Sequence, residues 1–329
     1  MAYDGKVLRR ASARYDEDRQ RREARLRALR RECYEKEPRL EEIDRELSHT
    51  MAKIIASGFR RGTDPRTAIE ALREENLGLQ RERSELLVSL GYPADALEPK
   101  SACDKCGDTG WKDGKMCECL RRYYVREQNR ELSMLLDLGS QSFDSFDIEY
   151  YSPTETFGHK KSAQQNMDDN LEKCSYFARH FPSRYKNLLF TGNPGLGKTH
   201  LSASIARVVS EAGHSVVYDT SAHIFSRFEA AKFSHDETDD AEEDVTRVLR
   251  CDLLIVDDLG TEMTTSFVQS ALYEIVNTRL MKQRCTVIST NLNPAQLGER
   301  YGEPLLSRIR GEYEILPFFG EDIRKLKKK

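Results

Sequence analysis

The feature that most constrains the fold is a glycine-rich octet, Gly192-Asn193-Pro194-Gly195-Leu196-Gly197-Lys198-Thr199, which fits the pattern G-x-x-x-x-G-K-[ST] without a gap. An apolar run, Leu188–Phe190, precedes it and a helical run, Leu201–Val209, follows it, as a phosphate-binding loop requires. Glycines let the backbone wrap a polyphosphate, and amide groups at the start of the helix face the anion. We therefore predict that the octet binds ATP, with Lys198 at the β- and γ-phosphates and the Thr199 hydroxyl on Mg²⁺.

A second apolar run, Leu253–Val256, ends in two carboxylates, Asp257 and Asp258. Ligands of open α/β sheets bind at the carboxyl ends of the strands, so we assign Asp257 to Mg²⁺ and Asp258 to polarising the attacking water. Related ATPases usually have glutamate at the second position. Because aspartate is one methylene shorter, we expect slow intrinsic hydrolysis. The alternative is that the pair only caps a turn with Gly260.

Short apolar runs alternate with helical stretches from residue 185 onward. The five strand candidates are Asn187–Thr191, Ser215–Asp219, Asp252–Asp257, Cys285–Thr290 and Glu312–Pro317. Strands separated by helices favour a parallel sheet covered on both faces, so we predict an α/β fold with a five-stranded parallel sheet. The run His235–Asp244 holds seven acids in ten residues, and we expect it to be a solvated surface loop.

Two further polar residues are candidates for contacts near the terminal phosphate. Asn291 ends the run from Thr286, where its side chain can hold the attacking water, although asparagine is also a common turn former. Arg308 lies on a short predicted helix before the last strand. An arginine delivered to a neighbouring subunit's γ-phosphate accelerates hydrolysis by roughly 10³–10⁵. A surface arginine taken alone is more often only solvated.

Four of the eight cysteines form a tight group with the spacing C-x2-C-x10-C-x-C, namely Cys103, Cys106, Cys117 and Cys119. In a chain without an export signal this clustering favours a metal over disulfides. Four thiolates in two close pairs can complete a tetrahedral Zn²⁺ site, and the glycines between them permit tight turns. An iron–sulfur cluster or a redox-active dithiol are the alternatives. The prediction is a structural zinc site.

The N-terminal part of the chain has a different composition. Residues 1–97 are dense in Arg, Glu and Leu, and predicted helices within residues 19–42 and 65–90 would form an antiparallel hairpin or short coiled coil. Such a region either docks a protein partner or only spaces domains. We divide the chain into a helical partner-docking region (1–97), a zinc-binding module (98–125), a connector (126–185) and a nucleotide-binding domain (186–329).

The charge balance and the hydropathy exclude several classes of protein. Lysine and arginine total 52 against 55 acids, a net charge of −3, so a global basic field for nucleic acid is absent, although a local patch is compatible. No stretch of 18 apolar residues predicts a membrane span, and the N-terminus lacks the apolar core of a secretory signal. We therefore expect a cytoplasmic protein without a membrane partner.

The spacing of GNPGLGKTHL, LLIVDDLGTE, STNL and RYGEPLLSRI resembles the AAA+ ATPase module of bacterial DnaC/DnaI-type replicative helicase loaders and the related IstB transposition ATPases, over roughly residues 140–320. His200 after the GKT, the DDLG-x-E segment and the SRI box match in register. The resemblance implies a AAA+ P-loop NTPase that hydrolyses ATP to ADP and phosphate. It makes Asp258 the catalytic carboxylate, Asn291 the sensor-1 residue and Arg308 the arginine finger, and it adds His200 to the nucleotide-binding residues.

The resemblance also implies partners. A loader of this type acts on a hexameric replicative DNA helicase and on single-stranded DNA, and it self-associates through its AAA+ domain. Phe225–Phe233 sits where similar initiator modules place a helix that faces single-stranded DNA, which makes Arg227 and Lys232 candidates for phosphate contacts. The expected function is ATP-dependent loading of the replicative helicase onto single-stranded DNA in replication initiation.

Two alternatives stay open. An IstB-like transposition ATPase would bind duplex DNA and regulate a transposase. It shares the ATPase motifs, but proteins of that kind generally lack the N-terminal zinc module that DnaI-type loaders carry. The other alternative is a nucleotide-binding adaptor with little turnover, which Asp258 in place of glutamate permits.

Overall fold

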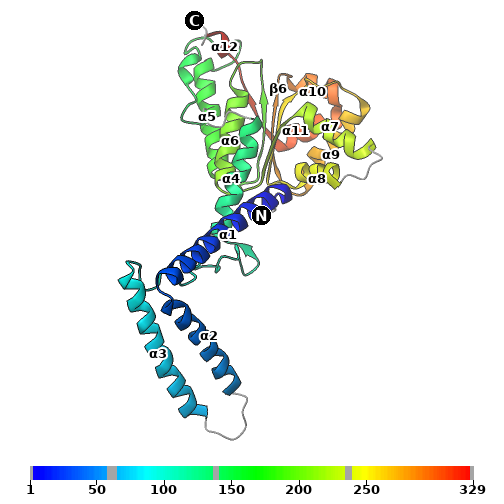
Figure 1. Ribbon diagram of the computed structural model, residues 1–329. Coiled ribbons are helices and arrows are strands. Elements are labelled where there is room, and N and C mark those ends of the chain that lie inside the picture. Colours follow the sequence, from blue (N-terminus) through cyan, green and yellow to red (C-terminus); the bar gives the residue numbers. More distant parts are fainter. Residues whose placement is uncertain (1–2, 58–64, 136–140, 234–238, 327–329) are drawn as a thin grey trace. The chain divides into compact units, whose positions relative to one another are not determined.

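The protein is described by a computed structural model that covers residues 3–57, 65–135, 141–233 and 239–326 (Figure 1). The chain divides into two compact units, one formed by Met1–Ser12 with Leu120–Lys329 and the other by Ala13–Cys119. The predicted boundaries after residues 97, 125 and 185 lie inside these units. The division of the chain into four functional regions stays a prediction. Among the described helices, none combines the length and the apolar character needed to cross a membrane.

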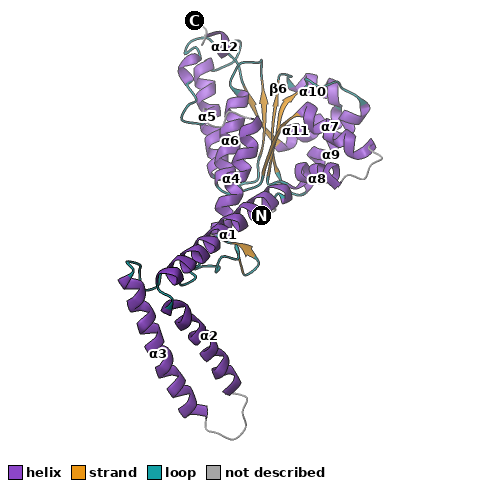
Figure 2. Ribbon diagram, viewed as in Figure 1, coloured by secondary structure: helices purple, strands orange, loops and turns teal. Residues whose placement is uncertain are grey.

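The larger unit is built on the predicted five-stranded parallel sheet (Figure 2). The strand order is β4-β5-β6-β3-β7. The strands are β3 (Asn187–Thr191), β4 (Val216–Thr220), β5 (Leu253–Leu259), β6 (Cys285–Thr290) and β7 (Tyr313–Pro317). All side chains of β3 and β6 are buried, as expected for a parallel sheet that is covered on both faces. The fold class predicted from the sequence is therefore confirmed.

Helices cover the two faces of this sheet because successive strand residues point to opposite sides. Leu188 and Phe190 pack in one buried cluster with α5 (Ala163–Arg179) and α6 (Lys198–Glu211). Leu189 packs in a second cluster on the other face. The helices of that face are α7 (Ser221–Phe233), α8 (Asp239–Arg250), α9 (Ser266–Met281), α10 (Pro294–Tyr301) and α11 (Glu303–Glu312). The remaining elements of this unit are α4 (Glu118–Leu135), the 3₁₀ turn η1 (Ile148–Tyr150) and α12 (Ile323–Leu326).

Part of the segment that we predicted as a connector contributes to this core. Helix α5 begins with a capping box between Ser162 and Gln165 and buries Met167 and Cys174 among the side chains under the sheet. The side chain of Asn170 donates to the carbonyl oxygen of Pro317 at 2.8 Å, which ties α5 to the end of the edge strand β7. This helix therefore helps to hold β7, which pairs with β3, the strand that the phosphate-binding loop follows.

The smaller unit contains most of α1 (Gly5–Lys36), α2 (Arg39–Ser57), α3 (Pro65–Ser89) and a short hairpin of β1 (Trp111–Lys112) and β2 (Lys115–Met116). The helical run that we predicted across residues 19–42 is interrupted, because Pro38 has no amide hydrogen to continue α1. An antiparallel pair is present, but its first helix is α2 rather than the predicted helix within residues 19–42, and its partner is α3. Arg39 at the start of α2 lies 2.8 Å from Glu82 near the end of α3.

The prediction of a surface loop over His235–Asp244 is wrong from Asp239 onward, where α8 begins; residues 235–238 lie outside the described part of the chain. Acidic residues favour the positive end of a helix, so this composition suits the first turns of α8. The same acids pair with the start of α1. Lys6 lies 3.0 Å from Asp244, and Arg9 lies 2.9 Å from Glu243.

Candidate nucleotide-binding site

The phosphate-binding loop joins β3 to α6 as predicted, and its glycines are required by close neighbours. A Cβ atom on Gly192 would lie 2.0 Å from the carbonyl oxygen of Phe318. Gly197 has a φ of +88°, and a Cβ there would lie 2.8 Å from the Tyr151 hydroxyl and 2.9 Å from the Phe146 ring. The backbone of the loop is therefore fixed by the packing around it as well as by its own sequence.

Lys198 is buried, with 5% of its surface exposed, and its ammonium group is held by three oxygen atoms. The Nζ atom donates to the carbonyl oxygens of Gly192 at 2.6 Å and Asn193 at 2.8 Å, and to Oδ1 of Asn291 at 2.8 Å. Burial lowers the pKa of Lys198 to about 8, against the opposing charge of Asp258. Added negative charge from a triphosphate would reverse this shift, so the site is built to receive an anion.

The predicted magnesium ligands lie together. The Thr199 hydroxyl donates to Oδ2 of Asp257 at 3.1 Å, and the hydroxyl groups of Tyr218 and Ser289 also donate to this carboxylate. Asp257 is only 4% exposed, so these donors hold it in one orientation. One hydroxyl oxygen beside one carboxylate is a donor set that suits Mg²⁺ with substrate phosphates. The chemistry of the two side chains therefore fits the predicted metal.

Asp258 follows in the same strand but faces the cavity beside the loop. Its φ of +53° is unusual for a residue with a Cβ, and this bend separates its side chain from that of Asp257. Burial raises the pKa of the Asp258 carboxyl, and the negative charge of Asp257 acts in the same direction. A half-buried carboxylate with a raised pKa can accept a proton from water more readily than an ordinary one.

These residues line one cavity of about 340 Å³. Lys198, Thr199, His200, Asp258 and Asn291 all reach it, so the structure brings together the phosphate and catalytic candidates that the sequence separates by almost a hundred residues. Sequence reasoning missed the remaining wall. It is formed by the segment before α5 and by the C-terminal helix, through Gln141, Ser145, Phe146, Asp147, Tyr150, Ile323 and Arg324.

His200 explains why the missed segment lies there. Its Nε2 atom is 2.9 Å from the carbonyl oxygen of Ser142, and its ring meets that of Phe146 edge-on with centroids 5.2 Å apart. The aromatic residues between 143 and 151 are a signal that could have placed this segment here, but we predicted it only as part of the connector. Arg324 stands in a lysine-rich tail that is typical of solvated charge.

Arg308 does not line this cavity. Its guanidinium lies over the Tyr273 ring at 5.3 Å from the centroid, and Nη2 donates to the Tyr273 hydroxyl at 3.1 Å. An arginine that acts on a neighbouring subunit is expected outside its own site, so the role of Arg308 stays a prediction. The two candidates on α7 differ from each other: Arg227 pairs with buried Asp219 at 2.8 Å, whereas Lys232 lies near the ring of Phe233.

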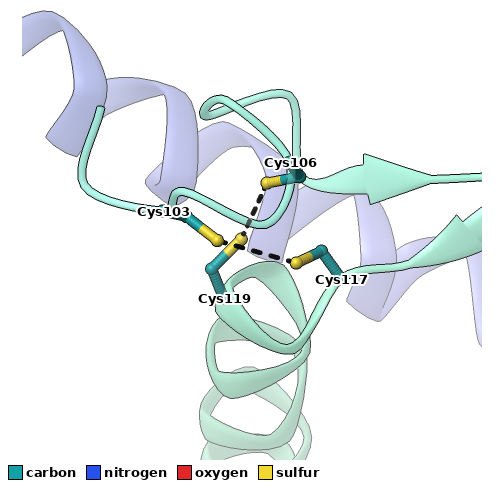
Figure 3. A group of neighbouring side chains, drawn as sticks. All are labelled: Cys103, Cys106, Cys117 and Cys119. Atoms are coloured by element: carbon teal, nitrogen blue, oxygen red, sulfur yellow. Dashed lines mark hydrogen bonds between the residues drawn. The ribbon is translucent and has the colours of Figure 1, made fainter. Parts of the chain in front are cut away.

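The four clustered cysteines converge as the spacing predicts (Figure 3). The Sγ atoms of Cys103 and Cys117 are 3.7 Å apart, those of Cys106 and Cys119 are 3.4 Å apart, and all four lie within 4.8 Å of one another. Zinc–sulfur bonds of about 2.3 Å in a tetrahedron require sulfur atoms about 3.8 Å apart. The cluster is consistent with a zinc site.

Residues around the cluster support its loops. The Asp108 carboxylate accepts the backbone amides of Ala102 and Cys103, each at 3.0 Å, and pairs with Arg22 of α1 at 3.1 Å. The Tyr15 hydroxyl lies 3.4 Å from Sγ of Cys119. Hydrogen bonds of this kind orient metal ligands.

Comparison with known protein families assigns the nucleotide-binding part of the chain to one family. The family described as IstB-like ATP binding protein matches residues 115–329, which is more than half of the chain. The chain belongs to the IstB-like ATP-binding family. The match begins between the two cysteine pairs of the cluster, so it includes the second pair and excludes the first.

Curated relatives of this IstB-like protein cover the same part of the chain. The uncharacterized protein YdaV of Escherichia coli K12 is 27% identical over 209 residues, which is 60% of this chain and 77% of YdaV. The replicative helicase loader DnaC of the same strain is 26% identical over 192 residues, which is 58% of this chain and 75% of DnaC. The chain is therefore homologous to DnaC at the level of the family.

Solved structures similar to this IstB-like chain include the DnaC helicase loader, with a TM-score of 0.46 and 22% identity over 56% of this chain and 99% of that one. The DnaI structure gives a TM-score of 0.43 and 18% identity over 56% of this chain and 92% of that one.

Proposed function

We propose that the protein is an ATPase that loads a hexameric replicative DNA helicase onto single-stranded DNA during the initiation of replication. One observation carries this proposal: Lys198, Asp258 and Asn291 line one cavity in an IstB-like domain, and Asp257 accepts a hydrogen bond from Thr199, which also lines it. Homology to the helicase loader DnaC supports the loading role. Work on replicating DNA would place the protein in the cytoplasm.

Hydrolysis follows from the arrangement of the side chains. The triphosphate would lie over the loop, with Lys198 on its terminal phosphates and with Thr199 and Asp257 holding Mg²⁺. The bound Mg²⁺ supplies positive charge that offsets the charge of the phosphate oxygens. Asp258 would orient the attacking water and accept its proton, and Asn291 would hold that water in line with the γ-phosphate. Asp258 is shorter than glutamate, so the basal rate is expected to be low.

The active assembly would contain more than one copy of the chain. Arg308 lies outside its own cavity and is held on the Tyr273 ring, so its guanidinium is oriented before any partner arrives. A second subunit would receive Arg308 at its γ-phosphate, where the guanidinium would stabilise the charge of the transition state. Self-association through this domain would make hydrolysis depend on the protein concentration.

Helix α7 supports contact with single-stranded DNA. Phe233 at its end is 60% exposed, and the Lys232 ammonium lies 5.8 Å from the Phe233 ring and 5.3 Å from the Phe267 ring. Exposed aromatic rings beside a cation can stack on bases and pair with the phosphate backbone. We assign the DNA contact to Lys232 rather than to Arg227, whose charge is already balanced by Asp219.

The N-terminal region would bind the helicase. The cysteine cluster would hold a structural Zn²⁺ through Cys103, Cys106, Cys117 and Cys119, since four thiolates leave no open position for catalysis. Zinc would stabilise a segment that has too few apolar residues for a core of its own. The described side chains of α2 and α3 include exposed charged residues, such as Arg45 and Glu85, that a protein partner could contact.

Native mass spectrometry of the full chain with a hexameric helicase, a non-hydrolysable ATP analogue and single-stranded DNA tests the proposal. We expect a complex that contains helicase and one zinc per chain, and we expect it to weaken in the Lys198→Ala variant, whereas the matched exposed control Lys282→Ala behaves as wild type. Failure to bind the helicase in any nucleotide state would contradict loading. Preference for duplex DNA with no helicase binding would favour a transposition ATPase, which the IstB-like family match also permits.

A further inference from the structure

Glu262 is a buried carboxylate, 9% exposed, that lies outside the cavity described above. Three neutral donors converge on it. The Ser221 hydroxyl donates at 2.6 Å, the amide of Gly260 donates at 3.0 Å, and the Tyr301 hydroxyl donates to its other oxygen. Burial acts to raise the pKa of Glu262, but the hydrogen bonds from Ser221 and Tyr301 outweigh it and hold the pKa below its usual value. The group is therefore a buried anion.

The three donors come from three different elements. Ser221 is the first residue of α7, Gly260 lies in the turn after β5, and Tyr301 is the last residue of α10. The side chain of Arg300 also donates to the backbone carbonyl of Glu262. Because hydrogen bonds to an ionised acceptor are stronger than those between neutral groups, one side chain joins these elements firmly.

The same hydrogen bonds reach Asp258. Its left-handed backbone is held on both sides: its amide donates to the Ser289 hydroxyl at 3.1 Å, and its carbonyl accepts from the Thr261 hydroxyl at 2.9 Å. The Ser221 hydroxyl lies 3.2 Å from that carbonyl and 2.6 Å from Glu262. The Ser221 oxygen is thus placed between the buried anion and the peptide that orients Asp258. A non-glycine residue keeps this backbone conformation only where its surroundings fix it.

The hydrogen bond from Tyr301 connects Glu262 to the helix pair that carries the proposed arginine finger. Tyr301 is followed by Gly302 and then by α11, which carries Arg308. A Cβ on Gly298 of α10 would lie 2.6 Å from the Leu306 side chain, so α10 and α11 are in close contact. Any displacement of Tyr301 would therefore move the helix that holds Arg308.

We propose that Glu262 is a positioning residue for ATP hydrolysis, which fixes the turn that orients Asp258 and joins it to the helix that precedes the Arg308 helix. It touches neither the nucleotide nor the reacting atoms. This inference rests on the proposed ATPase function. Loss of the Glu262 carboxylate would misplace the carboxylate of Asp258 but leave the phosphate-binding loop intact. Turnover of ATP would therefore fall, whereas the affinity for nucleotide would not.

Steady-state hydrolysis by the full-length Glu262→Gln variant tests this inference. The amide keeps the shape of the side chain but lacks the charge and presents a donor to one of its partners. We expect kcat to fall about tenfold, with the KM for ATP and the affinity for a fluorescent non-hydrolysable analogue within about twofold of wild type. The control is Glu299→Gln, which changes an exposed glutamate on α10 and should behave as wild type.

The variants Ser221→Ala and Tyr301→Phe each remove one donor and keep the carboxylate, so they decide the question if Glu262→Gln does not fold. We expect each to lower kcat about threefold with KM unchanged. Unchanged kcat in all variants, with an active wild type, would overturn the positioning role and leave the ATPase proposal standing. A wild-type protein that hydrolyses no ATP with helicase and single-stranded DNA would overturn both. A lower melting temperature together with a raised KM and a lowered kcat would show that Glu262 only stabilises the fold.

Discussion

The ammonium group of Lys198 lies 2.8 Å from the side-chain oxygen of Asn291. This hydrogen bond connects the phosphate-binding loop to the end of β6, the strand next to β3 in the sheet. One polar side chain therefore holds the residue that would contact the β- and γ-phosphates. When a triphosphate binds, Lys198 would exchange its present oxygen partners for phosphate oxygens, and Asn291 would become available to the attacking water.

Replacing Asn291 should lower the rate of ATP turnover without weakening the binding of ATP. We expect Asn291→Ala to lower kcat by about 10- to 100-fold while the KM for ATP changes little, because the amide is needed to align water rather than to hold the nucleotide. Steady-state hydrolysis measures both constants. Asn277→Ala on α9 is a matched control, since the side chain of Asn277 donates only to Sδ of Met281 among the described hydrogen bonds. A similar kcat in both variants would argue against a role for Asn291.

Arg308 should act on a neighbouring subunit. We expect Arg308→Ala to bind ATP as wild type does but to hydrolyse it at least about 100-fold more slowly, because the charge on the γ-phosphate is no longer neutralised. Mixing it with Lys198→Ala should restore part of the activity, since the latter cannot bind ATP but can supply Arg308. If mixtures of the two variants are as inactive as each one alone, Arg308 does not act between subunits.

Nucleotide binding should take up a proton at alkaline pH. The pKa of Lys198 without nucleotide is lowered to about 8, so at pH 8.5 its amine is neutral in most protein molecules. The bound triphosphate favours the charged form, so these amines must take up a proton. We expect uptake of about 0.7 proton per ATP at pH 8.5 and little at pH 7, where Lys198 already carries its proton. Affinity should therefore fall as the pH rises above about 8.

Calorimetry in buffers of different ionisation enthalpy measures this uptake directly. The same titration with Arg324→Ala serves as a comparison, because Arg324 adds a positive charge that also lowers the pKa of Lys198. Removing it should reduce the uptake at pH 8.5. Equal heats in all buffers at pH 8.5 would show that Lys198 is fully charged before ATP binds.

Loss of zinc should affect the smaller unit and leave the nucleotide site intact. We expect Cys103→Ser to contain less than about 0.1 zinc per chain and to lose the structure around the cluster, because metal binding supplies much of the folding free energy of such modules. ATP affinity should be unchanged. Elemental analysis and limited proteolysis near residue 103 check this, with the exposed neighbour Ser101→Ala as control. Full folding of Cys103→Ser without metal would contradict a structural zinc site.

Much of the nucleotide site could be predicted because its chemistry is local in the sequence. The loop from Gly192 to Thr199 needs glycines and a following helix in consecutive positions, and Asp257 and Asp258 are recognisable at the end of an apolar strand. Parallel strands bring their carboxyl ends to one edge, so Asn291 could be placed near them from its position after β6. The four cysteines were predictable for the same reason, since their spacing satisfies one small coordination sphere.

The other wall of the cavity was decided only by tertiary structure. Phe146, Tyr150 and Arg324 lie at opposite ends of the nucleotide-binding part of the chain and carry no pattern that points to a ligand. No pattern in the sequence predicts the partners of Glu262 or the pairing of Arg227 with Asp219. A motif records interactions between neighbours along the chain, whereas these contacts depend on how α5, α7 and α10 pack against the sheet.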